Sequence, residues 1–287
     1  MSAPPFPPRA QWLPLLERAL AEDIGTGDAT SAAVLAAGAV AAARIEARAP
    51  LVACGLPLAQ AVFEAVDPAL ACETERDEGA AVPAGAPLLR VEGPARGLLA
   101  AERTALNFLA RLCGIATWTR RFVETVAGTG VEILDTRKTL PGWRVLDKYA
   151  VAVGGGRNHR FGLYDAILIK DNHVAAAGGV AAAVKAARAS APSHLAIQVE
   201  VESEAEAAAA IEAGARLLPL DNRTSVELRR LAERFRAQAL LEASGGVTLA
   251  NVREIAESGV HRISIGALTH SAPAADVALE LRTRERG

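Results

Sequence analysis

Residues 133–173 read ILDTRKTLPGWRVLDKYAVAVGGGRNHRFGLYDAILIKDNH, and this stretch decides the fold. It opens with a short apolar run that ends abruptly at the polar residues 135–138. A second apolar run, at 166–169, ends just as abruptly at 170–173. A short apolar run bounded by polar residues is typical of a buried strand. The stretch therefore predicts two strands whose ends carry polar and charged side chains.

Cationic side chains, or side chains that can become cationic, are gathered in this stretch, among them Arg137, Lys138, His159, Arg160 and Lys170. They follow the two predicted strands or the glycine triplet at 154–156. Like charges gathered at such positions repel one another, so their density indicates an anionic ligand. The alternative to a ligand site is that these side chains form a structural network of ion pairs.

The same organisation repeats along the rest of the chain. Six apolar runs each end in a polar or glycine cluster, at 131–134, 166–169, 197–201, 217–220, 240–243 and 262–265. Helical patterns fill most of the gaps, at 180–189, 204–213, 225–238 and 249–258. Alternating strands and helices predict a parallel sheet. Polar residues after successive strands indicate a TIM-like α/β barrel with its site at the carboxyl ends of the strands. Six strands mean that the barrel is open, or that two strands lie in the first third.

The first third predicts a small α+β unit. Helical spacing of leucines covers 11–22, strands are expected at 40–48 and 80–91, and a helix is expected at 57–66. The proline-rich residues 1–9 are expected to be disordered.

A long helical pattern at 97–127 follows, with a break expected near Gly114. Leu99, Leu106, Leu109 and Cys113 form its apolar stripe. This helix is expected to connect the small unit to the rest of the chain.

The totals limit the possible functions. The formal net charge of the 287 residues is −2, which argues against a general nucleic-acid or anionic-membrane binder. Three cysteines without close metal-ligand spacing indicate reduced, structural thiols. No apolar run reaches the roughly 18 residues of a membrane span, and the N-terminus lacks the apolar core of a signal peptide. We therefore expect a soluble, cytoplasmic protein.

Two acidic residues and two glycine clusters narrow the range of possible ligands. Glu200 and Asp221 follow strands beside the cations, where they suit sugar hydroxyls or Mg²⁺ carried in with phosphates. The segments 244–246 and 266–267 follow the last two strands, where loops opening onto helix N-termini commonly bind phosphate. Taken singly, Glu200 could be an ion-pair partner, and the glycines could be mere turns. Together they indicate a phosphorylated, activated ribose that meets an acidic partner.

At this point the chain resembles the quinolinate phosphoribosyltransferase family. The matching stretches cover essentially the whole chain in the family's order: EDIGTGDAT, GLLAAERTALNFLARLCGIAT, the 41-residue block quoted above, VEVE, LDN, SGG and ISIGALTHS. There are two departures. Gln198 stands where the family commonly has an acidic residue, and Pro219 interrupts a strand.

The resemblance implies an α/β enzyme with an N-terminal α+β sandwich domain at 1–114, which a C-terminal helix at 272–287 rejoins. An open six-stranded α/β barrel at 115–271 would carry catalysis. It implies a pentosyltransferase of NAD biosynthesis that converts quinolinate and phosphoribosyl pyrophosphate to nicotinate mononucleotide, pyrophosphate and CO₂ with Mg²⁺. It also implies a homodimer with a shared active site, which could assemble further into a hexamer.

The resemblance also implies roles for residues. Quinolinate's carboxylates would be held by Arg103 (from the neighbouring subunit), Arg137, His159, Arg160 and Lys170, with Thr136 beside them. Lys138 and Lys170 would face the pyrophosphate, and Glu200 and Asp221 would handle ribose hydroxyls and the metal, directly or through water. The 5-phosphate would be held by Ser244, Gly245, Gly246, Ile265, Gly266, Ala267 and His270. The catalytic set would be Lys138, Lys170, Glu200 and Asp221.

Three rival functions remain open on the sequence alone. A relative of the same fold could act on another acceptor, although the intact 136–138 and 170–173 segments weigh against this. A catalytically dead nucleotide-binding regulator should have lost a charged position, and none is missing. A nucleic-acid binder would show a steep salt dependence, which the overall charge does not favour.

Overall fold

The computed structural model describes residues 3–282 and divides them into two compact units. The first unit comprises residues up to 120 together with 140–155 and the segment from 271 onward. The second comprises 121–139 and 156–270. The sequence analysis expected 140–155 in the barrel, whereas these residues make their contacts within the first unit.

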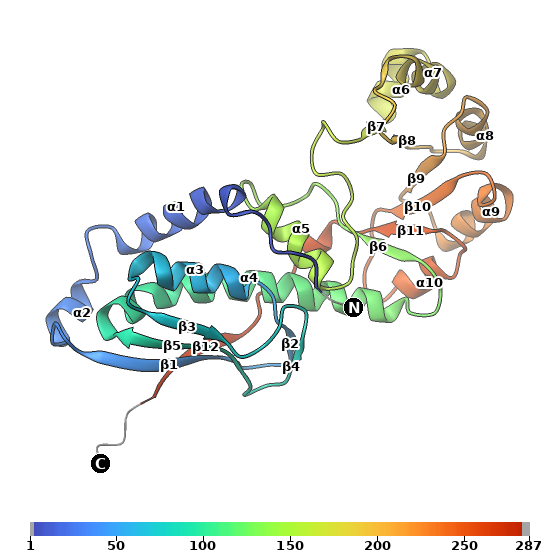
Figure 1. Cartoon of the computed structure of the whole chain (residues 1–287). Coiled ribbons are helices and arrows are strands. Elements are labelled where there is room, and N and C mark those ends of the chain that lie inside the picture. The colour runs from blue at the N-terminus through green and yellow to red at the C-terminus, as the bar shows by residue number, and fades with distance from the viewer. Residues whose placement is uncertain (1–2, 283–287) are drawn as a thin grey trace. The chain divides into compact units, whose positions relative to one another are not determined.

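The first unit is built on a four-stranded antiparallel sheet in the order β12-β1-β5-β3, with a separate two-stranded sheet of β2 and β4 (Figure 1). The helix α3 packs against β3. Its elements are η1 (Arg9–Gln11), α1 (Leu13–Ile24), α2 (Ala29–Val34), β1 (Val40–Ala47), β2 (Leu51–Val52), α3 (Leu56–Val66), β3 (Ala71–Thr74), β4 (Ala81–Val82), β5 (Pro87–Pro94), most of α4 (Ala95–Thr125), α5 (Arg144–Val153) and β12 (Val277–Arg282). The predicted α+β unit is confirmed, but the strand expected at 80–91 is divided into β4 and β5.

The helix α4 is continuous from Ala95 to Thr125, so the break predicted near Gly114 is wrong. Gly114 serves another purpose. A Cβ atom at this position would lie 2.2 Å from the carbonyl oxygen of Pro273, because the segment that leads into β12 passes directly over the helix. The backbone N–H of Ala275 donates to the carbonyl of Ala110 at 2.7 Å in the same crossing. Glycine is therefore required for a close backbone approach rather than for a kink.

The C-terminal helix expected at 272–287 is also wrong over the residues that the structure describes. Residues 277–282 form β12, which pairs antiparallel with β1. Apolar residues in this segment, Val277, Leu279 and Leu281, recur at every second position, which is the period of a strand. The segment does return to the first unit, but as an edge strand. The remainder of the expected helix, 283–287, lies outside the described residues.

The proline-rich start of the chain is packed rather than disordered from residue 3 onward. The ring of Phe6 meets Trp12 and Tyr149 edge-on, with centroids 5.8 and 4.9 Å apart. The indole N–H of Trp12 donates to the carbonyl of Pro7 at 2.9 Å. Two aromatic anchors thus hold a segment that has no regular structure of its own.

The second unit is a six-stranded parallel sheet in the order β6-β11-β10-β9-β8-β7. The two end strands of this order do not pair with each other within residues 3–282, so the sheet is open, and the predicted open α/β barrel is confirmed. Its elements are β6 (Glu132–Leu134), β7 (Ile167–Ile169), α6 (Asp171–Ala177), α7 (Val180–Ser190), β8 (Ile197–Val199), α8 (Glu204–Glu212), β9 (Leu217–Asp221), α9 (Ser225–Phe235), β10 (Leu240–Ser244), α10 (Val252–Ala256), β11 (Arg262–Ser264) and α11 (Ala267–His270).

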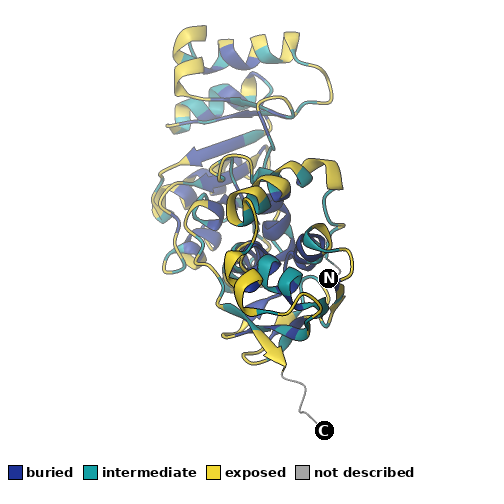
Figure 2. Ribbon diagram, turned by 90° about the vertical axis from the view of Figure 1, so that its left-hand side faces the viewer, coloured by how far each residue is buried: buried dark blue, intermediate teal, exposed yellow. Residues whose placement is uncertain are grey.

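Local sequence explains where the helices of this unit begin. The helix α9 starts with a capping box, in which the Thr224 hydroxyl accepts from the backbone of Glu227 and the Glu227 carboxylate accepts from the backbone of Thr224. Its apolar face, with Leu228, Leu231 and Phe235, is buried, and the helix contacts β10. In Figure 2 the strands of this unit are largely buried, whereas exposed residues lie along its helices. None of the helices within residues 3–282 is long and apolar enough to cross a membrane.

A buried ion pair in the first unit gives a stability prediction. The Arg111 guanidinium donates to both carboxylate oxygens of Asp147, from Nε at 2.8 Å and from Nη2 at 2.7 Å. Asp147 is fully buried, and burial raises the pKa of its carboxyl even though Arg111 acts in the opposite direction. We expect Asp147→Ala to lower the free energy of unfolding by about 3–5 kcal/mol, because it removes one partner of a buried, doubly hydrogen-bonded pair.

Denaturant unfolding of the two proteins measures this loss. The exposed Arg48–Glu280 pair supplies a control in the same unit, since its side chains are about half exposed. Glu280→Ala should cost less than about 1 kcal/mol. Equal losses of unfolding free energy in the two variants would show that the buried pair contributes no more to stability than the exposed one.

Candidate active site

The register of the parallel sheet decides which side chains meet at its carboxyl edge. Asp221 at the end of β9 pairs with Ser244 at the end of β10, and Ser244 pairs with Ser264 at the end of β11. Leu134 at the end of β6 pairs with Ser264 in turn. One row of residues thus crosses four neighbouring strands, and the loops that follow these residues lie side by side.

A cavity of about 560 Å³ opens at this edge, entirely within the second unit. Every residue for which the sequence predicts a site role, except Arg103, lines it: Thr136, Arg137, Lys138, His159, Arg160, Lys170, Glu200, Asp221, Ser244, Gly245, Gly246, Ile265, Gly266, Ala267 and His270. Arg103 lies on α4 in the first unit, and its predicted role stays a prediction.

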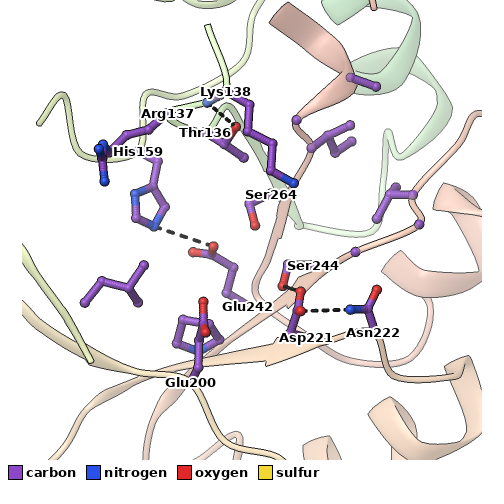
Figure 3. Close-up of a pocket in the computed structure, with 18 of the residues that line it drawn as sticks. Thr136, Arg137, Lys138, His159, Glu200, Asp221, Asn222, Glu242, Ser244 and Ser264 are labelled. Carbon is purple, nitrogen blue, oxygen red and sulfur yellow. Dashed lines mark hydrogen bonds and ion pairs between the residues drawn. The ribbon is translucent and has the colours of Figure 1, made fainter. Parts of the chain in front are cut away.

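The acidic side of the cavity holds two carboxylates with different partners. Glu200 accepts a 2.7 Å hydrogen bond from Nζ of Lys170, and both side chains reach the cavity. Asp221 accepts from the Ser244 hydroxyl at 2.6 Å and from the Asn222 amide at 2.8 Å (Figure 3). These bonds hold the Asp221 carboxylate at the end of β9. Within residues 3–282, no cationic side chain forms an ion pair with it. Hydroxyl groups of a sugar or a hydrated cation suit such oxygens.

The cationic side is built from two arginines. Burial lowers the pKa of Arg160 below its ordinary value, and the charge of Arg137 adds to this effect, while Asp165 and Glu200 oppose it. Nη1 of Arg160 donates to the carbonyl of Ala166 at 3.1 Å. Asp165 accepts the backbone N–H groups that follow Arg160, and this tight turn fixes where the guanidinium projects. Two arginines that repel each other are most stable around a shared anion.

The glycine clusters leave room for a ligand at the far end of the cavity. Gly245 and Gly246 have positive φ angles of 85° and 61°, and a Cβ atom on Gly245 would lie 2.0 Å from Oδ1 of Asn222. A Cβ on Gly266 would meet Lys138 and the His270 ring at 3.0–3.1 Å. The positive φ angles favour glycine at 245 and 246, and a side chain at 245 would also collide with Asn222, whereas one at 266 would require Lys138 or His270 to shift slightly.

The structure corrects one detail of the predicted phosphate cradle. The helix expected at 249–258 is the short α10, which begins at Val252, several residues beyond the glycines. The loops at 244–246 and 266–267 therefore do not open onto long helices. Any binding of phosphate there depends on loop backbone and on side chains such as Lys138 and His270.

The sequence analysis gave no site role to two polar residues, Glu242, which lines the cavity, and Gln198, which it noted only as a departure from the family. Glu242 is 2% exposed, lies in the middle of β10 and lines the cavity. Its Oε2 atom has no hydrogen-bond partner among residues 3–282. Gln198 on β8 is 7% exposed and meets His159. Both stand inside apolar runs, and a single polar residue within an otherwise apolar strand was the available signal.

The burial of Glu242 predicts a pH-dependent stability. Burial raises the pKa of Glu242 above its ordinary value of 4.5, outweighing the Ser264 hydrogen bond and the Arg262 charge, while Glu200 raises it further. The folded protein therefore holds this proton more tightly than the unfolded chain. The resulting stabilisation is present below the ordinary pKa and is lost as the pH rises through the raised one.

Glutamine cannot ionise, so Glu242→Gln should keep this stabilisation at every pH. We expect equal melting temperatures for the variant and the wild type at pH 4, and a higher one for the variant at pH 8. Calorimetry at the two pH values measures the difference. Glu257 is exposed, and Glu257→Gln serves as the control. The difference in melting temperature between this variant and the wild type should be the same at pH 4 and pH 8. A variant that is less stable than the wild type at pH 8 would mean that the Glu242 carboxylate is stabilised by a partner.

Comparison with known proteins agrees with this geometry. Two family models match the chain: "Quinolinate phosphoribosyl transferase, N-terminal domain" at residues 28–113, and the corresponding C-terminal domain at 115–280. The chain belongs to the quinolinate phosphoribosyltransferase family. The family resemblance noted in the sequence is thereby confirmed.

Individual relatives extend the match over nearly the whole chain. The nicotinate-nucleotide pyrophosphorylase (carboxylating) of Mycobacterium leprae is 45% identical over 276 residues, covering 93% of this chain and 95% of its own. The solved nicotinate-nucleotide pyrophosphorylase of Francisella tularensis is 38% identical, covers 96% of this chain and 98% of its own, and has a TM-score of 0.92. The structure of NadC from Streptococcus pyogenes is 35% identical, covers 97% and 99%, and has a TM-score of 0.93.

Proposed function

We propose that this enzyme transfers phosphoribose from phosphoribosyl pyrophosphate to quinolinate, with decarboxylation, to give nicotinate mononucleotide, pyrophosphate and CO₂ in NAD biosynthesis. The observation that carries the proposal is the cavity of the second unit. It combines two arginines and two lysines with three acidic side chains, Glu200, Asp221 and Glu242, in a chain that matches the family over both domains.

The residues divide into groups by the charge that they would meet. Arg137, Arg160 and Lys170 supply the positive charge for the two carboxylates of quinolinate, and Arg guanidinium groups bind carboxylates through two parallel hydrogen bonds. Lys138 faces the pyrophosphate. Its side chain passes Gly266 and ends near Ser264 inside the cavity (Figure 3).

The chemistry needs no covalent protein nucleophile. The pyridine nitrogen of quinolinate attacks the anomeric carbon of the ribose while the C–O bond to pyrophosphate breaks, through a state with positive charge on the ribosyl group. Glu200 and Asp221 stabilise this charge, and Lys138 and Lys170 stabilise the negative charge of the leaving group. The nitrogen then carries a positive charge. The ring therefore accepts the electron pair released when the adjacent carboxylate leaves as CO₂, and a proton replaces it at that carbon.

The residues present fit a magnesium ion that enters with its substrate. Glu200 and Asp221 offer the oxygen atoms that Mg²⁺ prefers, whereas residues 3–282 contain no group of three or more His, Cys, Asp and Glu that could hold a metal. Such a set suits Mg²⁺ that is bound mainly by phosphates and water, with one or two carboxylates directly or through water. When bound, the ion supplies charge neutralisation of the diphosphate.

We also propose that the enzyme acts in the cytoplasm as a homodimer whose active sites are shared, with further assembly to a hexamer open. The shared dimer rests on the family resemblance, in which Arg103 comes from the neighbouring subunit, and the cytoplasmic location rests on the three cysteines, which indicate reduced thiols.

The choice of acceptor tests the function directly. We expect release of labelled CO₂ from quinolinate that depends on phosphoribosyl pyrophosphate, and turnover of nicotinate lower by at least roughly a hundredfold, because the arginines would face only one carboxylate. The measurement is initial rate with each acid at equal concentration. Comparable turnover of nicotinate, or of another acceptor without CO₂ release, would favour a same-fold relative with a different substrate.

A further inference from the structure

One residue that lines the cavity has an unusual backbone conformation. Asn222 follows Asp221 at the end of β9 and has a φ angle of 53°, and within residues 3–282 it is the one non-glycine residue with a positive φ angle. Such angles are uncommon outside glycine and cluster at functional sites, where the surrounding structure maintains them. Asparagine tolerates this conformation better than most residues do, so a tight turn between β9 and α9 is one reason for its presence.

The contacts of Asn222 join the ends of β9 and β10. Its backbone N–H donates to the carbonyl of Ser244 at 2.8 Å, which continues the pairing of the two strands by one residue. Its side-chain Nδ2 donates to Oδ2 of Asp221 at 2.8 Å, while the Ser244 hydroxyl donates to Oδ1 of Asp221 at 2.6 Å (Figure 3). Because a carboxylate only accepts hydrogen bonds, the NH₂ end of the amide must be the end that faces Asp221.

The other end of the same amide packs on the glycine loop that follows β10. A Cβ atom at Gly245 would lie 2.0 Å from Oδ1 of Asn222 and 2.6 Å from its Cγ, so the amide occupies the space that a side chain at 245 would need. The amide therefore lies between the Asp221 carboxylate and the loop 244–246. A shift of the amide would move the carboxylate relative to this loop.

We infer that Asn222 is a positioning residue whose side-chain amide orients the Asp221 carboxylate at a fixed distance from the loop 244–246. Each carboxylate oxygen has two lone pairs, so one acceptor position on each remains for a ligand. The consequence for catalysis rests on the proposed function, in which these positions meet the ribose hydroxyls while the loop binds the 5-phosphate. A phosphorylated ribose spans the carboxylate and the loop, and the amide matches their separation to the size of the sugar phosphate.

Three substitutions at this position separate the role of the amide from that of the turn. Asn222→Gly removes the amide and adopts a positive φ angle without strain, whereas Asn222→Ala removes the amide and strains the turn. Asn222→Asp keeps the shape but places a second carboxylate against Asp221, which repels it. If only the turn matters, Asn222→Gly should be fully active. If the amide matters, Asn222→Gly and Asn222→Ala should lose activity to the same extent, although Asn222→Gly should melt at the higher temperature.

Steady-state kinetics of CO₂ release measure the loss. We expect kcat/KM for phosphoribosyl pyrophosphate to fall about tenfold in Asn222→Gly and Asn222→Ala, and about a hundredfold in Asn222→Asp, because a hydrogen bond to a charged group is lost or replaced by repulsion. The KM for quinolinate should stay within about twofold in all three variants. Gln238→Ala removes an exposed amide just beyond α9 and should keep the wild-type values. Wild-type kcat/KM in Asn222→Gly would overturn the inference.

A double-mutant cycle tests whether Asn222 acts through Asp221. In the Asp221→Ala background the carboxylate is absent, so adding Asn222→Gly should lower kcat/KM by less than about twofold, against about tenfold in the wild-type background. A further tenfold loss in that background would mean that Asn222 acts on the substrate directly, and would overturn the inference.

Failure of the proposed function would show in the wild type itself, which would then release no CO₂ from quinolinate. Calorimetric binding of phosphoribosyl pyrophosphate to the same variants does not depend on the acceptor. The same ratios between variants are expected in the dissociation constants, and equal binding by the wild type and Asn222→Gly would overturn the inference.

Discussion

Replacing Glu200 by glutamine, or Asp221 by asparagine, is expected to lower kcat by roughly 10²- to 10³-fold while the protein stays folded. Each change removes a negative charge beside the ribosyl cation and keeps the size of the side chain. Glu200 accepts from Lys170, so its loss also frees the lysine charge that faces the leaving group. Asp221 is held by Ser244 and Asn222, and an asparagine at 221 would keep only part of this geometry.

Fold and turnover must be measured on the same samples. Cooperative melting within a few degrees of the wild type, together with the loss of kcat, is the expected result. Glu202→Gln is a matched control, because Glu202 lies two residues beyond Glu200 but is exposed and does not line the cavity. It should retain nearly full activity. Loss of the cooperative melting transition in Glu200→Gln or Asp221→Asn would instead mean that these carboxylates serve as structural ion-pair partners.

The open parallel sheet and the gathering of the site residues follow from local features of the sequence. Short apolar runs marked all six strands, and parallel strands must bring the residues after them to one edge. That rule alone places Arg137, Lys170, Asp221 and Ser244 around one cavity. The roles of these side chains came from the family resemblance and stay predictions.

What the sequence did not show depends on contacts between distant segments. Gly114 looked like a helix break because the chain that crosses over it, at 273–275, is more than 150 residues away in the sequence. The strand β12 has its partner β1 at the opposite end of the chain. Glu242 was taken as part of an apolar run and Gln198 only as a departure from the family, since no local pattern tells a buried functional side chain from a tolerated polar one.

If two chains share each active site, mixing two inactive variants should restore activity. Arg103 lies in the first unit, whereas every other predicted site residue lines the cavity of the second. The family resemblance gives this arginine a place on quinolinate from the neighbouring subunit. If so, Arg103→Ala and Lys138→Ala damage different halves of each site. In a two-fold heterodimer of the two variants, one site receives both defects and the other receives neither.

The experiment dissociates the two purified variants, mixes them in equal amounts and lets them reassociate. Random pairing makes half of the dimers heterodimers with one intact site each, so activity should recover to roughly a quarter of the wild type. Different affinity tags on the two chains verify and isolate the heterodimers, which should then show roughly half the wild-type activity. Mixing Lys138→Ala with Lys170→Ala provides the control, because both defects lie in the same unit. Each site of that heterodimer keeps one defect, and no activity should return. Inactive heterodimers of Arg103→Ala and Lys138→Ala would mean that Arg103 acts within its own chain or not at all.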